Sequence, residues 1–164
     1  MAPRLSVVWD RLLQRYDADF PNLLSDGFAF TSPWEGHYNC IAWAAADSTK
    51  WWWPVRQLGP GVHWPDECAR EVTLDAFLHA FRVQGYALCE NGSHFVGIEK
   101  IAIYADAQDV PTHCARQLPN GAWTSKLGQN YDILHRSPES LEGGLYGVVA
   151  AYMERHRPGD HSAD

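Results

Sequence analysis

The sequence lacks the features that mark nucleic-acid-binding, membrane-spanning and secreted chains. Its 13 lysines and arginines are scattered among 20 acidic residues, and the formal net charge of −7 leaves no basic cluster for phosphate groups. No apolar run reaches the roughly 18 residues that a membrane-spanning helix requires. Residues 1–5 do not begin the long apolar segment of a secretory signal. These absences predict a cytoplasmic protein that binds neither nucleic acid nor membrane, with export by a non-classical route left open.

Cysteine is scarce, and its spacing gives no support to a zinc knuckle or ribbon. The four cysteines stand far apart, at Cys40, Cys68, Cys89 and Cys114, and none belongs to a C-x-x-C pair. In a cytoplasmic chain we expect their thiols to be reduced. A metal site built from Cys40, His113 and a further histidine or aspartate would lack a closely spaced ligand pair. The sequence therefore predicts no metal and no other cofactor.

The composition is that of one globular domain that is rich in tryptophan. The chain has 164 residues, of which 46% are hydrophobic and 20% are charged. This is enough for one domain with a sizeable core. We expect residues 1–157 to form that domain and residues 158–164 to form a flexible polar tail.

The hydrophobic pattern changes along the chain from helical spacing to alternation. Helices are expected at residues 5–17, from residue 40 to about 47, and from residue 74 to about 84, with Asn39 and Thr73 as caps of the last two. Strands are expected at residues 86–89, 97–105, 111–118, 122–126 and 132–134, with a hairpin turn at Asn120-Gly121. Residues 146–153 are expected to form a last strand in preference to a short helix. This order predicts an α+β fold in which N-terminal helices pack on one side of an antiparallel meander.

One cysteine stands at the expected start of the second helix, in the segment 37–44 (His-Tyr-Asn-Cys-Ile-Ala-Trp-Ala). Asn39 is a good N-cap, so Cys40 would lie in the first turn, where free N–H groups and the helix dipole favour a thiolate. The thiolate is a nucleophile, but free cysteine is also among the most buried residue types. The segment therefore predicts either a reactive cysteine or a core cysteine.

A cysteine nucleophile needs a base, and the base needs an orienting partner. Among eight histidines, His113 lies in an expected strand, where its ring would be either held in place as a base or satisfied as a polar residue of the sheet. Asp132 is the first carboxylate after the hairpin and fits the orienting role, with Asn130 as its rival. Ser125 and Lys126 lie on the return strand and point either toward the same site or outward. These residues predict a cysteine–histidine site with a carboxylate or an amide as third member.

The residue after His113 is a second cysteine, Cys114. Successive residues of a strand point to opposite faces of the sheet. If His113 points into the site, we therefore expect Cys114 to point away from it, into the core.

Aromatic and polar residues near Cys40 are candidates for substrate binding. Trp52, Trp53 and Trp64 belong to an irregular stretch rich in proline and glycine, and their indoles either close the core or wall a cleft beside Cys40. The main-chain N–H of Cys40 would form part of an oxyanion hole, and Asn39 is one candidate for the second donor.

Several motifs give the chain a resemblance to a family of small, uncharacterised bacterial domains. They are YNCIAWA at 38–44, PTHxARQL at 111–118 and WTSKLG at 123–128. More remotely, the order resembles papain-like and NlpC/P60-like cysteine hydrolases. In those enzymes the cysteine begins a buried helix, the histidine opens a sheet strand, and a polar residue lies on the next strand. The resemblance implies a papain-like fold with Cys40 as nucleophile, His113 as base and Asp132 as third residue, and it implies no substrate.

Two functions follow from these residues. The first is a thiol-dependent hydrolase or acyltransferase that acts on the amide bond of a peptide or a peptidoglycan-like substrate. The second is a non-enzymatic binding module for a protein partner, as in a toxin–immunity pair, with Cys40 in the core and an acidic surface that suits a basic partner. Geometry separates them, because the enzyme needs the Cys40 sulfur and a ring nitrogen of His113 within about 4 Å of each other.

Overall fold

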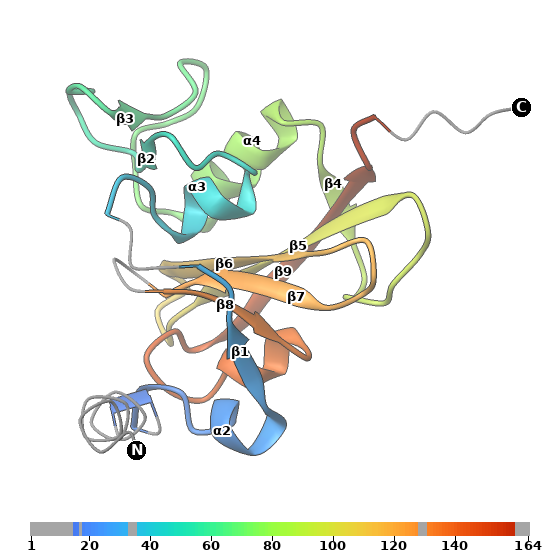
Figure 1. Ribbon diagram of the computed structural model, residues 1–164. Coiled ribbons are helices and arrows are strands. Elements are labelled where there is room, and N and C mark those ends of the chain that lie inside the picture. Colours follow the sequence, from blue (N-terminus) through green and yellow to red (C-terminus); the bar gives the residue numbers. More distant parts are fainter. Residues whose placement is uncertain (1–14, 17, 33–35, 128–130, 160–164) are drawn as a thin grey trace, which may run out of the picture.

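The computed structural model describes residues 15–16, 18–32, 36–127 and 131–159, and one antiparallel sheet dominates them (Figure 1). The sheet has seven strands in the order β1-β8-β7-β6-β5-β9-β4. Their bounds are Phe28–Phe30 (β1), Ala87–Cys89 (β4), Ile98–Ala105 (β5), Pro111–Gln117 (β6), Trp123–Lys126 (β7), Asp132–His135 (β8) and Val148–His156 (β9).

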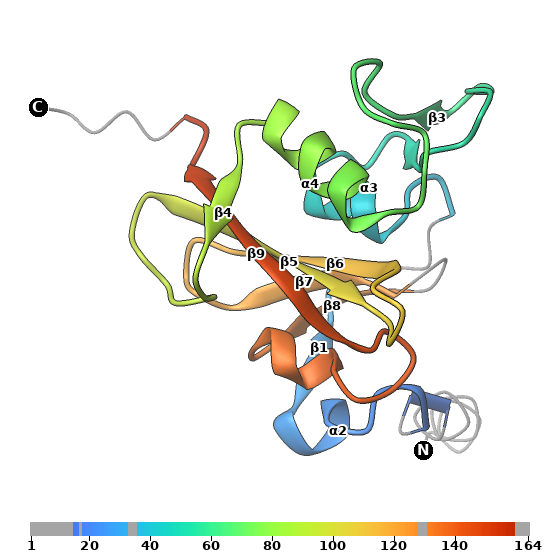
Figure 2. The same cartoon turned by 180° about the vertical axis from the view of Figure 1, so that it is seen from behind.

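Short helices and a small parallel ladder complete the described structure. They are α2 (Leu23–Asp26), α3 (Cys40–Ala44), α4 (Leu74–Val83), the 3-10 turn η1 (Pro138–Leu141), and the paired strands β2 (Trp51–Trp52) and β3 (Val62–His63). Figure 1 shows α3 and α4 on one side of the sheet and α2 on the other, and Figure 2 shows the same arrangement from behind. Among the described residues, no helix has the length and apolar character needed to cross a membrane.

The expected α+β class, with N-terminal helices packed on a papain-like sheet, is wrong, because the fold is β-rich and its helices are few and short. The helix after Asn39 has only five residues. It ends there because Ala46 adopts a φ of 60° and the Asp47 side chain then accepts the N–H of Thr49 in a turn. The expected helix at residues 5–17 lies largely outside the described residues, as does most of the expected C-terminal tail.

Both expected helix caps and the strands from β4 to β9 are confirmed. Asn39 Oδ1 accepts the N–H of Ala42 at 3.0 Å, and Thr73 Oγ1 accepts the N–H of Ala76 at 3.2 Å. After α4 the chain turns at Gly85, whose φ of +94° is favourable for a residue without Cβ. These features depend on residues only a few positions apart, which is why the sequence predicts them.

The strand order departs from the expected meander at both edges. β9 pairs with β5 and with β4, so it separates two strands that follow one another in the sequence. β1, which has no expected counterpart, pairs with β8 at the other edge. The sheet thus depends on pairings between distant segments, which local periodicity does not report.

Both faces of the sheet are buried. A hydrophobic cluster under α3 and α4 contains Ile103 and Cys114, and a second cluster on the other side contains Tyr104 and Ala115. We call these sides the α3 face and the Tyr104 face. Successive residues of a strand alternate between the two faces. The position of a residue along its strand therefore decides which face its side chain lies on and which side chains it can contact.

β6 and β7 are paired over a short distance only. Their register consists of Arg116 with Thr124 and Gln117 with Trp123, and within the described residues it does not continue toward Cys114. α3 packs against both strands. Cys40, the first residue of α3, is near the N–H of Cys114 in β6 and near Lys126 in β7, two residues that lie beyond the paired part of this ladder.

Candidate functional site

Cys40 is the first residue of α3, and its side chain lies on the α3 face. The bond between Asn39 and the N–H of Ala42 fixes the point at which the helix begins. Cys40 is 8% exposed and belongs to the same hydrophobic cluster as Cys114 of β6. The predicted nucleophile is thus a buried residue at the junction of α3 and β6.

The Cys40 sulfur has neighbours that favour its thiolate, but burial outweighs them. Burial is the largest effect and raises the pKa of the Cys40 thiol to about 11. The main-chain N–H groups of Cys114, Ile41 and Cys40 itself lower this pKa. The ammonium of Lys126 lowers it further. Because α3 has five residues, its macrodipole is small, and these N–H groups act individually. Cys40 is therefore a neutral thiol at pH 7.

His113 lies on the Tyr104 face, on the other side of the sheet from Cys40. Its ring stacks on Tyr146, with the centroids 4.0 Å apart and the planes at 6°, and meets the edge of Tyr104 at 5.2 Å. The side chain is fully buried, and this burial lowers the pKa of His113 well below its ordinary value. Of the two neighbours on β6, it is Cys114 that faces Cys40.

A chain of hydrogen bonds holds His113 on that face. Its Nε2 lies 3.0 Å from Ser125 Oγ, Ser125 Oγ lies 2.8 Å from His135 Nε2, and His135 Nδ1 lies 2.8 Å from the carbonyl oxygen of Ser137. The carbonyl only accepts, so His135 Nδ1 carries a proton. Burial lowers the pKa of His135 to about 4, so at pH 7 its Nε2 is an acceptor. The Ser125 hydroxyl consequently donates to His135 and accepts from His113.

The donor and acceptor roles in this series of hydrogen bonds assign the tautomer of His113. Because Nε2 of the neutral ring donates to Ser125, Nδ1 is unprotonated. Within the described part of the chain, this buried nitrogen has no hydrogen-bond partner. The one basic atom of the ring is therefore a buried nitrogen that has no hydrogen bond to the Cys40 sulfur.

Asp132 lies on the α3 face beside Lys126, its partner in the β7–β8 ladder. Asp132 Oδ2 accepts hydrogen bonds from the hydroxyls of Tyr38 at 2.6 Å and Ser32 at 2.5 Å. The Lys126 ammonium lies 3.9 Å from Asp132 Oδ1 and 4.5 Å from the centre of the Tyr38 ring. The two charged side chains are 0% and 1% exposed, so each depends on the other for charge compensation.

The structure does not bring the three predicted catalytic residues together. Cys40 and Asp132 share the α3 face, whereas His113 lies on the Tyr104 face. Within the described residues, no hydrogen bond joins the His113 ring to the Cys40 sulfur or to the Asp132 carboxylate. Asn130, the rival third residue, lies outside the described residues. The Lys126 ammonium lowers the pKa of the Cys40 thiol, and Cys40 in turn raises the pKa values of Cys114 and Tyr146.

The three tryptophans predicted to bind substrate lie in the packing of the α3 side. Trp52 and Trp64 are 5% and 1% exposed, and their indole N–H groups donate to Asp47 Oδ2 at 2.8 Å and to the Ala69 carbonyl at 2.9 Å. Trp53 is half-buried and packs against the same cluster. Their indoles close the core over α3 and α4.

Asn39, the remaining predicted binding residue, joins α3 to β2. Its Nδ2 donates to the Trp52 carbonyl at 2.7 Å, and its Oδ1 accepts the N–H of Trp52 at 3.1 Å as well as that of Ala42. The side chain is 3% exposed. Asn39 therefore fixes the start of α3 against the tryptophan-rich segment and positions Cys40.

The sequence did not reveal the hydrogen-bond partners of Asp132 or the residue beyond Ser125 in the hydrogen bonds of His113. Ser32 and Tyr38 both donate to Oδ2 of the Asp132 carboxylate, and His135 extends the hydrogen bonds of His113 and Ser125 on the Tyr104 face. A usable signal was the period of two along β7, which puts Ser125 and Lys126 on opposite faces. Ser32 and Tyr38 come from distant segments, and no local pattern marks them.

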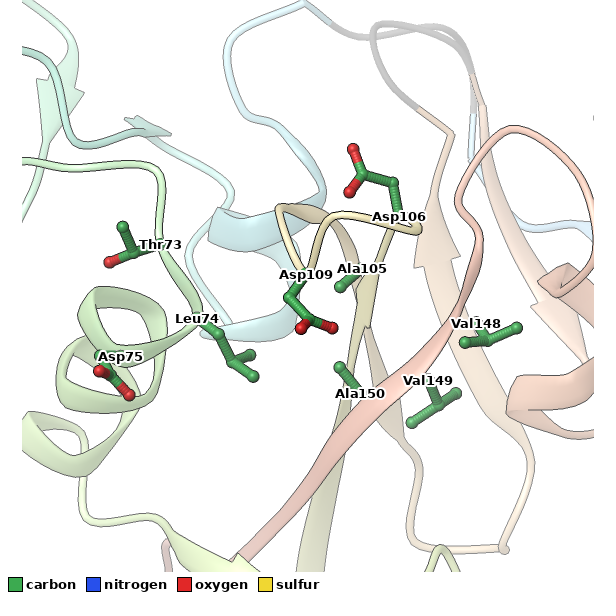
Figure 3. Close-up of a pocket in the computed structure, with 9 residues that line it drawn as sticks. All are labelled: Thr73, Leu74, Asp75, Ala105, Asp106, Asp109, Val148, Val149 and Ala150. Carbon is green, nitrogen blue, oxygen red and sulfur yellow. The ribbon is translucent and has the colours of Figure 1, made fainter.

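The cavity drawn in Figure 3 contains none of the predicted site residues. Its volume is about 530 Å³, and it lies between the start of α4, the β5–β6 turn and the first residues of β9. The carboxylates of Asp106 and Asp109 point in different directions there (Figure 3). Asp106 Oδ1 accepts the N–H groups of Gln108 and Val110, so it shapes the turn. Over the described ranges, no group of three or more His, Cys, Asp or Glu side chains is placed to hold a metal ion.

Comparison with known proteins identifies a family. The chain belongs to the family described as "Domain of unknown function (DUF7689)", which matches residues 29–154. This match confirms the resemblance to an uncharacterised domain family and gives no support to a papain-like relationship. No curated protein and no solved structure matches the chain. The matched range includes Cys40, Lys126 and Asp132.

Proposed function

We propose that this chain is a thiol-dependent hydrolase or acyltransferase that acts on an amide bond, with Cys40 as its nucleophile. The observation that carries the proposal is the setting of the sulfur, where three main-chain N–H groups (Cys114, Ile41 and Cys40 itself) and the Lys126 ammonium favour an anion. Burial alone opposes them. Access of water to the sulfur would therefore weaken the effect of burial and lower the pKa of Cys40 from about 11.

Lys126 is the group that we propose as proton donor and acceptor beside Cys40, in place of His113. The buried Lys126 ammonium lies 3.9 Å from the Asp132 carboxylate, whose opposite charge compensates it. Tyr38 and Ser32 hold that carboxylate in position through two short hydrogen bonds. Lys126, held by Asp132, would thus be a fixed cation next to the nucleophile Cys40.

The proposed reaction proceeds through a thioester. Once water reaches the site, the Cys40 thiol loses its proton to solvent, and the thiolate attacks the amide carbonyl carbon. The C–N bond then breaks, and the amine leaves with a proton from the Lys126 ammonium. Water, or a second amine in acyl transfer, attacks the thioester, gives its proton to the neutral Lys126 amine and releases the Cys40 thiolate. The N–H groups around the sulfur are the candidates for stabilising the oxyanion in both steps.

An activated ester tests this proposal. After incubation of the full chain with p-nitrophenyl acetate, peptide mass spectrometry should find an acetyl thioester on Cys40. Cys89 is the internal reference, because it is only partly buried and its thiol competes for the same reagent. We expect Cys40 to be acylated faster than Cys89. Acylation of Cys89 with none on Cys40 would contradict the proposal.

Two serine variants provide the matched control. Hydrolysis of the ester should be lost in Cys40→Ser and retained in Cys89→Ser. Equal activity in both variants would show that the turnover does not pass through Cys40.

A binding module for a protein partner is the second candidate. It is favoured by the burial of Cys40 and by the engagement of His113 with Ser125 on the other face. In that case Cys40 is a core residue, and neither an acyl adduct nor ester turnover depends on it. The two serine variants therefore separate the candidates.

A further inference from the structure

Three arginines surround one glutamate where β5, β6 and β9 lie side by side. Glu99 of β5 is 2.8 Å from Arg155 Nη2, 3.0 Å from Arg157 Nη1 and 3.9 Å from Arg116 Nη1. We call these four residues the arginine cluster. Three positive charges and one negative charge give it a formal charge of +2, in a chain whose net charge is −7.

Glu99 does not need the third arginine. Its Oε1 accepts hydrogen bonds from the Tyr86 hydroxyl at 2.7 Å and from Arg155 Nε and Nη2 at 3.0 and 2.8 Å. Its Oε2 accepts from Arg157 Nη1 at 3.0 Å. A carboxylate offers about four acceptor positions, so these bonds satisfy it. Arg116, at 3.9 Å, is beyond hydrogen-bond distance and is a surplus cation beside a satisfied carboxylate.

Arg116 is held in place by contacts that leave its terminal nitrogens available. Its Nε donates to the Trp43 carbonyl at 3.2 Å, and its guanidinium carbon lies 5.4 Å from the centre of the Trp43 ring. Among the described residues, neither Nη atom donates a hydrogen bond, and neither is a buried unpaired atom. The side chain is 14% exposed. The guanidinium therefore presents free donors to solvent from a fixed plane.

We propose that the arginine cluster binds the carboxylate or phosphate group of a small anionic ligand, with Arg116 as the principal donor. A guanidinium carries paired N–H groups that match the oxygens of such a group. Burial lowers the pKa of Arg116. Glu99 and Tyr86 raise it, and the charges of Arg157 and Arg155 act in the same direction as burial. A bound anion would compensate the surplus charge. The site lies on the α3 face, but its binding does not depend on the reactivity of Cys40.

Isothermal titration calorimetry on the full chain tests the site with two probes, inorganic phosphate and succinate, at an ionic strength held constant with sodium chloride. We expect at least one probe to bind, and its affinity to fall by about tenfold or more in Arg116→Gln. Arg56→Gln is the matched control, because Arg56 is an exposed arginine in the loop between β2 and β3. The affinity of the Arg56→Gln variant for the probe should equal that of the wild type.

The outcomes decide the proposal. Binding of phosphate alone identifies a phosphate-bearing ligand, and binding of succinate alone identifies a carboxylate. Binding of neither probe, unchanged affinity in Arg116→Gln, or an equal loss in Arg56→Gln would overturn the site. Arg116→Lys is the second variant, because it keeps the charge beside Glu99 and Trp43 but loses the paired donors. It should fold like the wild type and bind the probe more weakly, and full affinity in this variant would also overturn the proposal.

Discussion

Replacing Ser125 with alanine is expected to destabilise the fold strongly. The Ser125 hydroxyl joins His113 and His135 at 3.0 and 2.8 Å. All three residues are almost completely buried, at 0%, 0% and 3% exposure. Removal of the hydroxyl leaves two imidazole nitrogens without a partner and without access to water. Each such group costs about 1–3 kcal/mol, so Ser125→Ala should lower the free energy of unfolding by about 2–6 kcal/mol.

Equilibrium unfolding in urea, followed by tryptophan fluorescence, measures this change. Ser25→Ala is the control, because the Ser25 hydroxyl donates to the Asn22 carbonyl in an exposed turn. We expect this variant to stay within about 0.5 kcal/mol of the wild type. A loss of less than about 1 kcal/mol in Ser125→Ala would refute the hydrogen-bond chain, because two buried nitrogens cannot lose their partner at so small a cost.

Three further predictions concern acid stability, a helix cap and a buried ion pair. Burial lowers the pKa of His135 to about 4, so the unfolded state, with a value of about 6.5, takes up the proton first. Stability should decline by up to about 3 kcal/mol as the pH falls from about 6.5 to about 4. Urea titrations in that window should show a weaker pH dependence in His135→Gln, and an unchanged dependence would contradict the assignment. Asn39→Ala removes three hydrogen bonds of α3 and β2 and should cost about 2–4 kcal/mol in urea unfolding. Thr73→Ala, which removes one cap bond, should cost about 1 kcal/mol, and equal losses would argue against a double role for Asn39. Lys126→Met leaves the Asp132 carboxylate buried without its cation and should cost about 3–5 kcal/mol. Adding Asp132→Asn should recover part of this loss, and a double variant no more stable than Lys126→Met would exclude the ion pair as its cause.

Local features of the fold follow from the sequence because they depend on neighbouring residues. Asn39 and Thr73 cap their helices as expected, and Asn120-Gly121 forms the turn between β6 and β7. The fold class does not follow in this way. The α3 helix stops after five residues, and the positions of β1 and β9 in the sheet are set by contacts with distant strands that no local pattern reveals.

The candidate site shows where pattern reasoning reaches its limit. The period of a strand predicts that His113 and Cys114 point to opposite faces, and they do. The period does not say which of the two residues faces α3. Both faces of this sheet are buried, so no contrast between a buried and an exposed face assigns them. The same parity places Lys126 beside Cys40 and Ser125 beside His113.

The most direct test of a cysteine site that acts with Lys126 and without His113 is the pH dependence of Cys40 labelling by iodoacetamide, with the site assigned by mass spectrometry. The wild type is compared with His113→Gln, which retains a donor for Ser125, and with Lys126→Gln. We predict the same midpoint pH for Cys40 in the wild type and in His113→Gln, and a higher midpoint in Lys126→Gln, because the ammonium lowers the pKa of the thiol. A higher midpoint in His113→Gln together with no change in Lys126→Gln would contradict this arrangement of the site.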